Sequence, residues 1–184
     1  MSKVLVPLAQ GCEELEAVTI IDVLRRGGVD VVTAGLEAGP VRGSRKTVLV
    51  PDTTLDEAIG SGGFDMVVLP GGLPGSDNLQ KDERLRKLLK EMHSKGKYTG
   101  AICAAPKVLA DVGILEGKKA TSYPGVLHKI NPPKVKVTTE AVVKDGTVIT
   151  SRSVGTAMDF ALTIIETLEG KAKRDEVEKA MERS

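Results

Sequence analysis

Cys103 lies where a strand-forming run gives way to the start of a helix, in the segment AICAAP. Small residues on both sides suit a sharp strand-to-helix turn that lifts a side chain above a sheet, as in a nucleophile elbow. A thiol at a helix N-terminus also faces unpaired N–H groups, which lower its pKa and favour the thiolate. The alternative is a small buried apolar residue, because free cysteines often fill that role. The pattern alone leaves both interpretations open.

Three glutamates, Glu13, Glu14 and Glu16, stand at the start of an apparent helix in the segment GCEELEAV. Acidic side chains there favour the positive end of the helix dipole, which accounts for at least two of them. One carboxyl could instead reach the cysteine, and two such neighbours would share a proton rather than both ionise. A protonated carboxyl could then donate a hydrogen bond to the thiolate and act as acid and base. The spacing does not choose among the three.

A glycine pair, Gly71 and Gly72, ends another strand-like run in the segment VVLPGG. Glycine lets the backbone approach a bound group closely and direct N–H donors toward a developing oxyanion. The sequence contains no G-x-G-x-x-G motif and no Walker lysine, so nucleotide binding has no support. Taken alone, such a pair is most often a simple turn.

The remaining candidate residues are weaker. His93 and His128 are the only histidines, and no H-x₃-H or C-x₂-C spacing predicts a metal site. Cys12 is interpreted as a small turn residue, with a disulfide to an oxidised Cys103 as the alternative. The serine-hydrolase motif G-x-S-x-G is absent from the sequence.

The elements that must position these residues alternate between apolar runs and amphipathic stretches. Strands are expected at residues 3–9, 29–35, 64–72, 98–103, 118–123 and 136–151, and a hairpin or small flanking strands at 39–52. Helices are expected at 13–28, after a capping box from Thr54 to Glu57, and at 81–96, 106–113, 155–170 and beyond 171. This alternation predicts a mostly parallel sheet covered on both faces, with ligands at the carboxyl ends of its strands. The turn at residues 11–16, the Gly71-Gly72 loop and the Cys103 turn should converge there.

Composition limits the classes of partner. The chain of 184 residues has a formal net charge of +1 and only 2% aromatic residues, so neither nucleic acid nor an anionic membrane is expected as a partner. No apolar run approaches the ~20 residues that span a bilayer, and no secretory signal is recognised at the N-terminus. Two cysteines do not make a disulfide scaffold, which favours a reducing cytoplasm. Residues 1–184 are expected to form a single domain.

Four segments in order, GCEELEAV, VVLPGG, AICAAP and ITSRSVGTAMDFAL, resemble the ThiJ/PfpI superfamily. The similarity is strongest to the branch of the Parkinson-associated DJ-one proteins and their bacterial YajL-like relatives. It implies a flavodoxin-like three-layer α/β/α sandwich with a mostly parallel central sheet, a homodimer, and a cysteine site that needs no cofactor or metal.

The resemblance also implies roles for particular residues. Glu16 matches the family's acid/base glutamate, and Cys103 matches its oxidation-sensitive nucleophile. The Gly71 and Gly72 amides match its oxyanion donors, and Ala104, directly after the cysteine, is expected to join them. The peptidase branch has a histidine in place of Ala104, which argues against protease activity.

For other positions, the family resemblance implies a role less directly. Arg45 and Arg152 fall where the family places basic or dimer-contact residues near the site. Tyr123 departs from the histidine that many close relatives have there, and a phenol cannot shuttle protons at neutral pH as imidazole can. Ser153 and Val154 replace a frequent glycine-proline pair, so the loop after Arg152 is expected to differ.

The function that these residues favour is a glutathione-independent glyoxalase, or protein deglycase. Cys103 would attack methylglyoxal-type oxoaldehydes or early glycation adducts of proteins, and Glu16 would move the protons that yield a hydroxy acid. One alternative is an oxidative-stress sensor or redox-regulated chaperone that acts through oxidation of Cys103. Another alternative is a structural dimer whose site has lost its activity. The departure from histidine at Tyr123 keeps this alternative under consideration.

Overall fold

The computed structural model describes residues 1–183, and its central feature is a seven-stranded sheet in the order β10-β11-β7-β6-β1-β2-β5. Every neighbouring pair is parallel except β10 and β11, which form an antiparallel hairpin at one edge. The strands are β1 (Lys3–Leu8), β2 (Asp30–Gly35), β5 (Thr53–Thr54), β6 (Met66–Leu69), β7 (Tyr98–Ile102), β10 (Val142–Asp145) and β11 (Val148–Ser151). The mostly parallel sheet expected from the sequence is confirmed.

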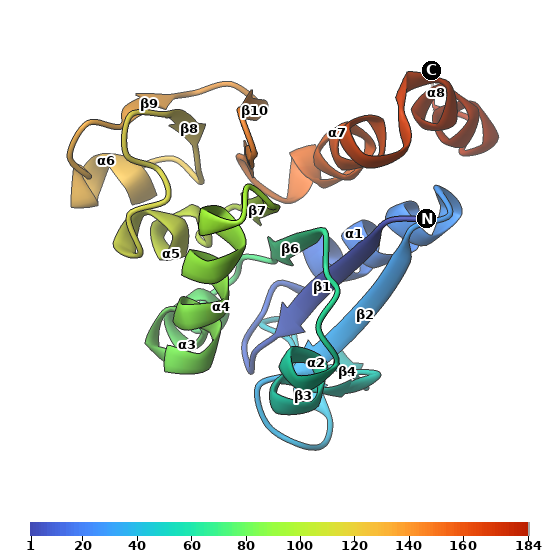
Figure 1. The fold of residues 1–184 in the computed structure, drawn as a ribbon, viewed down its shortest axis with the longest axis horizontal. Helices are drawn as coiled ribbons and strands as arrows, with labels where there is room; N and C mark the ends of the chain where they lie inside the picture. Colours follow the sequence, from blue (N-terminus) through green and yellow to red (C-terminus); the bar gives the residue numbers. More distant parts are fainter. Residues whose placement is uncertain (184) are drawn as a thin grey trace.

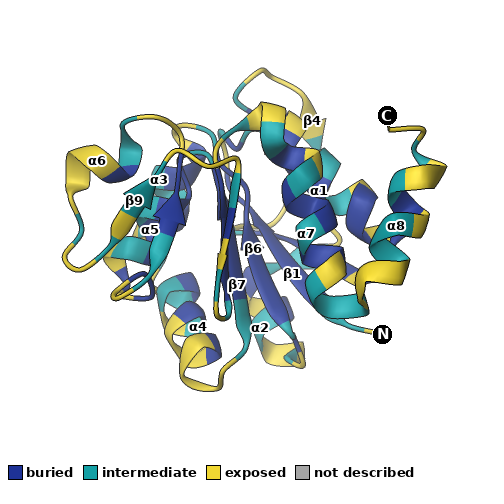
Figure 2. Ribbon diagram, turned by 90° about the horizontal axis from the view of Figure 1, so that it is seen from above, coloured by how far each residue is buried: buried dark blue, intermediate teal, exposed yellow. Residues whose placement is uncertain are grey.

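Helices cover both faces of this sheet (Figures 1 and 2). One layer contains α1 (Glu14–Arg26), α7 (Ala157–Glu169) and α8 (Lys171–Ala180), and the other contains α2 (Leu55–Ser61), α3 (Gly75–Lys81), α4 (Glu83–Ser94) and α5 (Pro106–Asp111). The side chains of each strand alternate between two buried apolar clusters, one under each layer. In β1, Val4 and Val6 join the cluster under α1 and α7, while Leu5 joins the opposite one. The three-layer sandwich is therefore confirmed.

Short elements lie outside the main sheet. β3 (Val41–Arg42) and β4 (Val48–Leu49) form the small antiparallel hairpin that the glycine-broken segment predicted. β8 (Lys119–Thr121) and β9 (Lys136–Thr138) pair in parallel as a second small sheet. Two short helices, α3 and α6 (Val126–Ile130), and a 3-10 turn at Val154–Thr156 were not anticipated, because segments this short carry little periodicity.

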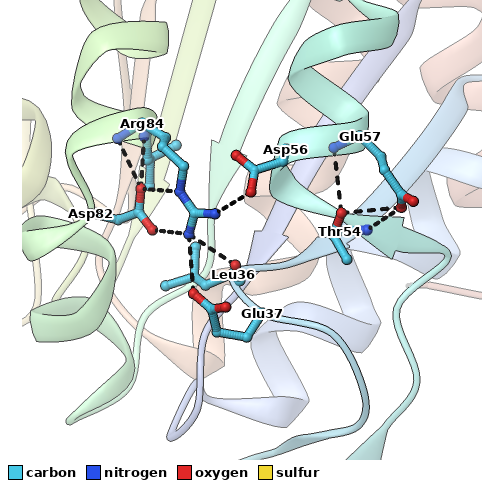
Figure 3. A network of polar contacts seen from close by, with 8 residues as sticks. Leu36, Glu37, Thr54, Asp56, Glu57, Asp82 and Arg84 are labelled. Atoms are coloured by element: carbon cyan, nitrogen blue, oxygen red, sulfur yellow. Dashed lines mark hydrogen bonds and ion pairs between the residues drawn. The ribbon is translucent and has the colours of Figure 1, made fainter.

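Arg84 joins three segments at the rim of the sheet (Figure 3). Its guanidinium donates to the carboxylate of Asp82, which caps α4, to Asp56 of α2 at 2.8 Å, and to the backbone oxygen of Leu36 at 2.9 Å. Leu36 follows β2, so one side chain ties that loop to the starts of two helices. The bond to a backbone oxygen fixes the loop more firmly than an exposed ion pair alone would.

The capping box expected at α2 is also present (Figure 3). Thr54 accepts from the backbone N–H of Glu57, and the Glu57 carboxylate accepts from the backbone N–H of Thr54. Among residues 1–183, none of the helices has the length and apolar character needed to cross a membrane.

Candidate active site

The carboxyl ends of β1, β6 and β7 bring three turns together, as the alternation of strands and helices predicted. The backbone N–H of Glu13, after β1, donates to the oxygen of Gly71, after β6, at 2.9 Å. Gly75 donates to the oxygen of Gly11 at 3.1 Å, which fixes the same two loops at a second point. Cys103 follows β7 and packs beside Gly71. All three segments therefore contribute to one site.

Cys103 occupies a sharp turn with φ of +63°, a conformation that is uncommon for a residue with a side chain. Its N–H donates to the oxygen of Ser151 at 3.0 Å, and its own oxygen accepts from the N–H of Tyr123 at 2.7 Å. These bonds hold the strained backbone on both sides. The strand-to-helix elbow expected from the small neighbours of Cys103 is present, and its thiol is half-buried.

Glu16 is the glutamate that reaches Cys103. It lies on α1 and is completely buried, with Oε2 accepting from the N–H of Gly71 at 2.8 Å. Within the described chain, Oε1 has no hydrogen-bond partner. Burial raises the pKa of Glu16 to about 7, although the bonds from Gly71 and from the Cys103 thiol lower it in part. A carboxyl in this environment readily holds a proton near neutral pH.

The thiol of Cys103 is not acidified simply by its place before α5. Burial, followed by the neighbouring charge of Glu16, raises the pKa of Cys103 to about 12, contrary to the expectation from the helix N-terminus. The backbone N–H groups of Gly72 and Ala104, which lie near the sulfur, oppose this rise. Since each group disfavours the charge of the other, the pair carries at most one negative charge near neutral pH.

The N–H of Gly71 makes a different contact from the one that the family resemblance implied. Its N–H is committed to Glu16, so Gly72 and Ala104 are the amides left to face the sulfur and a developing oxyanion. A Cβ atom at position 71 would lie 2.6 Å from Cys103 Cβ and 2.6 Å from Glu16 Oε2. Glycine is needed there because Cys103 and Glu16 approach one another across it.

The other two glutamates of the cluster hold backbone. Glu13 caps α1 and accepts from the hydroxyl of Ser44 at 3.0 Å. Glu14 is 8% exposed and accepts from the backbone N–H groups of Arg45, at 2.9 and 3.0 Å, and of Thr47, at 3.1 Å. Burial opposes ionisation of Glu14, but these bonds prevail and lower its pKa to about 2. Glu14 therefore fixes the loop between β3 and β4.

A cavity of about 320 Å³ opens above Cys103 and Glu16. Arg45 and Tyr123 line it, as do Ser153 and Val154, so the loop with the unusual pair does face the site. Arg152 is not part of its lining and donates instead to the oxygen of Thr139 at 3.0 Å. The sequence interpretation missed Ser44, Leu73 and Val126, which complete the wall without a motif of their own.

Cys12 is structural. It is 1% exposed within the apolar cluster under α1 and α7, and burial raises its pKa to about 11. It is not bonded to Cys103, and both cysteines are free. Within residues 1–183 no group of three or more His, Cys, Asp or Glu side chains could hold a metal ion. The turn-residue interpretation of Cys12 agrees with its burial.

The fold and site together define a flavodoxin-like α/β protein with a cysteine on a strand-to-helix elbow beside a buried glutamate. The model of the DJ-1/PfpI family matches residues 2–167. The chain is 47% identical over 183 residues to protein dj-1beta of Drosophila melanogaster, covering 98% of this chain and 97% of that protein. It is 37% identical over 172 residues to the glutathione-independent glyoxalase DJR-1.2 of Caenorhabditis elegans, covering 94% and 91%.

The crystal structure of Drosophila melanogaster DJ-1beta matches with a TM-score of 0.95 at 45% identity, and the match covers 100% of both chains. This chain belongs to the DJ-1/PfpI family, in its DJ-1 branch.

Proposed function

We propose that this protein is a glutathione-independent glyoxalase that converts methylglyoxal-type oxoaldehydes to hydroxy acids. The observation that carries the proposal is the buried carboxyl of Glu16 beside the half-buried thiol of Cys103, with backbone donors on both groups. A nucleophile, a proton carrier and oxyanion donors are the parts this reaction needs. The Caenorhabditis elegans relative named as a glutathione-independent glyoxalase supports the choice of reaction.

We propose that the shared negative charge rests on sulfur and not on the carboxyl. Two backbone N–H groups, of Gly72 and Ala104, reach the sulfur, whereas one, of Gly71, reaches Glu16. The second carboxyl oxygen of Glu16 has no partner in the described chain, and leaving a charged buried oxygen unpaired is costly. Although burial leaves the pKa of Cys103 above that of Glu16, we propose that the reactive form is a Cys103 thiolate next to a protonated Glu16, because the carboxylate would leave Oε1 unpaired.

The first step forms one bond and moves one proton. The Cys103 thiolate attacks the aldehyde carbon of methylglyoxal, and the C=O electron pair becomes an alkoxide. As charge leaves the sulfur, the amides of Gly72 and Ala104 are free to donate to that oxygen. Glu16 then gives its proton to the alkoxide, which yields a neutral hemithioacetal and a carboxylate.

The second step is an internal redox exchange between adjacent carbons. The Glu16 carboxylate removes the hydrogen of the former aldehyde carbon as a proton and returns it to the neighbouring carbon, while the hydroxyl proton of the first carbon passes to the ketone oxygen. The aldehyde level is thereby oxidised and the ketone is reduced. The product is a lactoyl thioester on Cys103. Water hydrolyses this thioester, releases lactate and restores the thiolate, with no external oxidant or reductant. Early glycation adducts, the substrates of the deglycase reaction, release the protein amine or thiol when they revert to free oxoaldehyde, and that oxoaldehyde would enter the same steps.

Lactate formation from methylglyoxal tests this proposal. Cys103→Ser and Glu16→Gln are each expected to lower kcat/KM at least a hundredfold, since each removes a group that touches the reacting atoms. Cys12→Ala is the matched control for loss of a cysteine and should retain activity, because Cys12 is buried away from the cavity lining. Near-normal turnover by either of the first two variants would contradict the mechanism.

Redox sensing is a second candidate, and the half-exposed position of Cys103 favours it. The same thiolate can be oxidised to a sulfinate, whose oxygens would accept hydrogen bonds from Gly72, Ala104 and protonated Glu16. Cys12 is too deeply buried to compete for oxidant.

A further inference from the structure

A second cavity, of about 250 Å³, shares Tyr123 as a lining residue with the cavity above Cys103 and Glu16. The lining of this second cavity includes Ser122, His128, Thr138 and Arg152, together with Tyr123 itself. It thus combines a guanidinium, an imidazole and several hydroxyl groups. None of the residues that line it carries a carboxylate. Such a set of donors is suited to a negatively charged ligand.

Arg152 is held in place but is not neutralised. One of its N–H groups donates to the backbone oxygen of Thr139 at 3.0 Å, and the guanidinium has further N–H groups that can bind an anion. Arg152 forms no ion pair with any carboxylate in residues 1–183. A tethered, unpaired guanidinium at a cavity wall loses less side-chain entropy on binding than a free one.

Thr138 supplies an independent observation. Its hydroxyl oxygen is buried and has no hydrogen-bond partner within the described chain, although Thr138 lines the second cavity. A buried hydroxyl without a partner is unfavourable and is satisfied when an acceptor or water enters. An oxyanion in this cavity would accept from the hydroxyl as well as from Arg152.

Tyr123 places the second cavity next to the nucleophile. Its backbone N–H donates to the oxygen of Cys103 at 2.7 Å, so the backbone at position 123 is fixed relative to the catalytic turn. Its side chain is 50% exposed and lines both cavities. The two cavities therefore adjoin at Tyr123.

We propose that the second cavity is a binding subsite for the anionic end, a carboxylate or a phosphate group, of an oxoaldehyde longer than methylglyoxal. The reacting aldehyde would lie above Cys103, and the anion would bind Arg152, His128 and Thr138. Tyr123 then separates the two subsites and restricts the length of the chain between them. The proposal rests on the proposed glyoxalase function for the identity of the reacting end, but binding of the anion can be measured without turnover.

The direct test is NMR of the histidine rings, because the protein has only His93 and His128. Levulinate, a 4-oxo carboxylate, and inorganic phosphate serve as probes, and 2-pentanone serves as the uncharged counterpart of levulinate. We expect at least one anion to shift the His128 resonances saturably while His93 and the 2-pentanone sample stay unchanged. The anion that binds distinguishes a carboxylate-bearing from a phosphate-bearing ligand. Binding should weaken about tenfold to a hundredfold in Arg152→Gln.

Lys136→Gln is the matched control for charge removal, since Lys136 is exposed on the strand that carries Thr138 and does not line the cavity. It should bind both anions as the unaltered protein does. The proposal is overturned if neither anion shifts His128, if 2-pentanone shifts it equally, or if Arg152→Gln and Lys136→Gln behave alike.

Kinetics give a second readout. For 4,5-dioxopentanoate, an oxoaldehyde with a carboxylate tail, we expect a higher kcat/KM than for methylglyoxal. Arg152→Gln should reduce the ratio of these two kcat/KM values about tenfold or more. An unchanged ratio in Arg152→Gln would contradict the subsite. If neither oxoaldehyde is turned over, the glyoxalase proposal fails, whereas the His128 titration still decides whether the cavity binds an anion.

Discussion

The backbone N–H of Gly71 donates to Oε2 of Glu16 at 2.8 Å, and this bond holds the carboxyl beside Cys103. Because the N–H is engaged, Gly71 would not act as an oxyanion donor in the proposed mechanism, which would instead depend on its lack of a side chain. A methyl group at this position would meet both Cys103 Cβ and Glu16 Oε2 at 2.6 Å. Cys103 and Glu16 can be close to each other only because residue 71 has no side chain between them.

Gly71→Ala is therefore expected to lower lactate formation at least a hundredfold while the protein still folds. Either Cys103 or Glu16 must move away from the new methyl group, and misplacement by about 1 Å is enough to cost about a hundredfold in rate. Gly60→Ala is the control, since a Cβ at Gly60 in α2 would meet nothing within 4 Å. Circular dichroism and methylglyoxal kinetics on both variants make the comparison. Equal activity of the two would show that Gly71 is only a turn residue.

Much of this arrangement followed from the sequence. The alternation of strands and helices predicts the three-layer fold, and the small residues around Cys103 predict its elbow, because both depend on local pattern. The choice of Glu16 over Glu13 and Glu14 did not follow from spacing. It depends on the rotation of α1 against the sheet, which buries Glu16 and points Glu14 at the β3–β4 loop.

The sequence was less informative where distant segments meet. The raised pKa of Cys103 reflects burial that no motif near the cysteine reveals. The second cavity is built from residues 122–125, 128, 138–139 and 152, which no local signal links. Arg152 was expected near the catalytic residues, but its bond to Thr139 keeps it beside the neighbouring cavity. The homodimer implied by the family resemblance stays a prediction.

Replacing Glu16 with glutamine is expected to stabilise the protein at alkaline pH while it abolishes activity. The pKa of Glu16 rises from 4.5 to about 7 on folding, so stability falls as the pH rises between these values. Placing the single negative charge of the Glu16–Cys103 pair in this buried site costs roughly 3 kcal/mol above pH 7, whichever of the two groups carries it. In urea unfolding at pH 5 and pH 8, the free energy of unfolding of Glu16→Gln relative to that of the unaltered protein should increase with pH. A constant difference would mean that Glu16 titrates normally in the folded protein.

Glu14 should show the opposite dependence on pH. Its pKa falls from 4.5 to about 2 on folding, so its contribution is complete above pH 4.5 and is lost as the pH falls toward 2. For this 8% exposed carboxylate, the contribution is on the order of 2 kcal/mol. At pH 7, Glu14→Gln should therefore be less stable than the unaltered protein, and at pH 3 this difference in stability should be smaller. Glu116→Gln, at an exposed position, should match the unaltered protein at both.

Mild peroxide should oxidise one cysteine and spare the other. Cys103 is half-buried at a cavity, whereas Cys12 is only 1% exposed. Peptide mass spectrometry is expected to find a gain of two oxygens on Cys103 alone, and the same gain in Cys12→Ala. Equal oxidation of both residues, or a disulfide between them, would exclude selective sensing by Cys103.

The central claim is that one negative charge is shared by the pair and is carried by sulfur while Glu16 keeps the proton. The most direct measurement is the ultraviolet absorbance of the thiolate between pH 5 and pH 11, taken as the difference between the unaltered protein and Cys103→Ala. We expect thiolate absorbance from Cys103 to be fully developed by pH 8. If that absorbance appears only above pH 10, the charge of the pair is on Glu16, and a resting thiolate at Cys103 is ruled out.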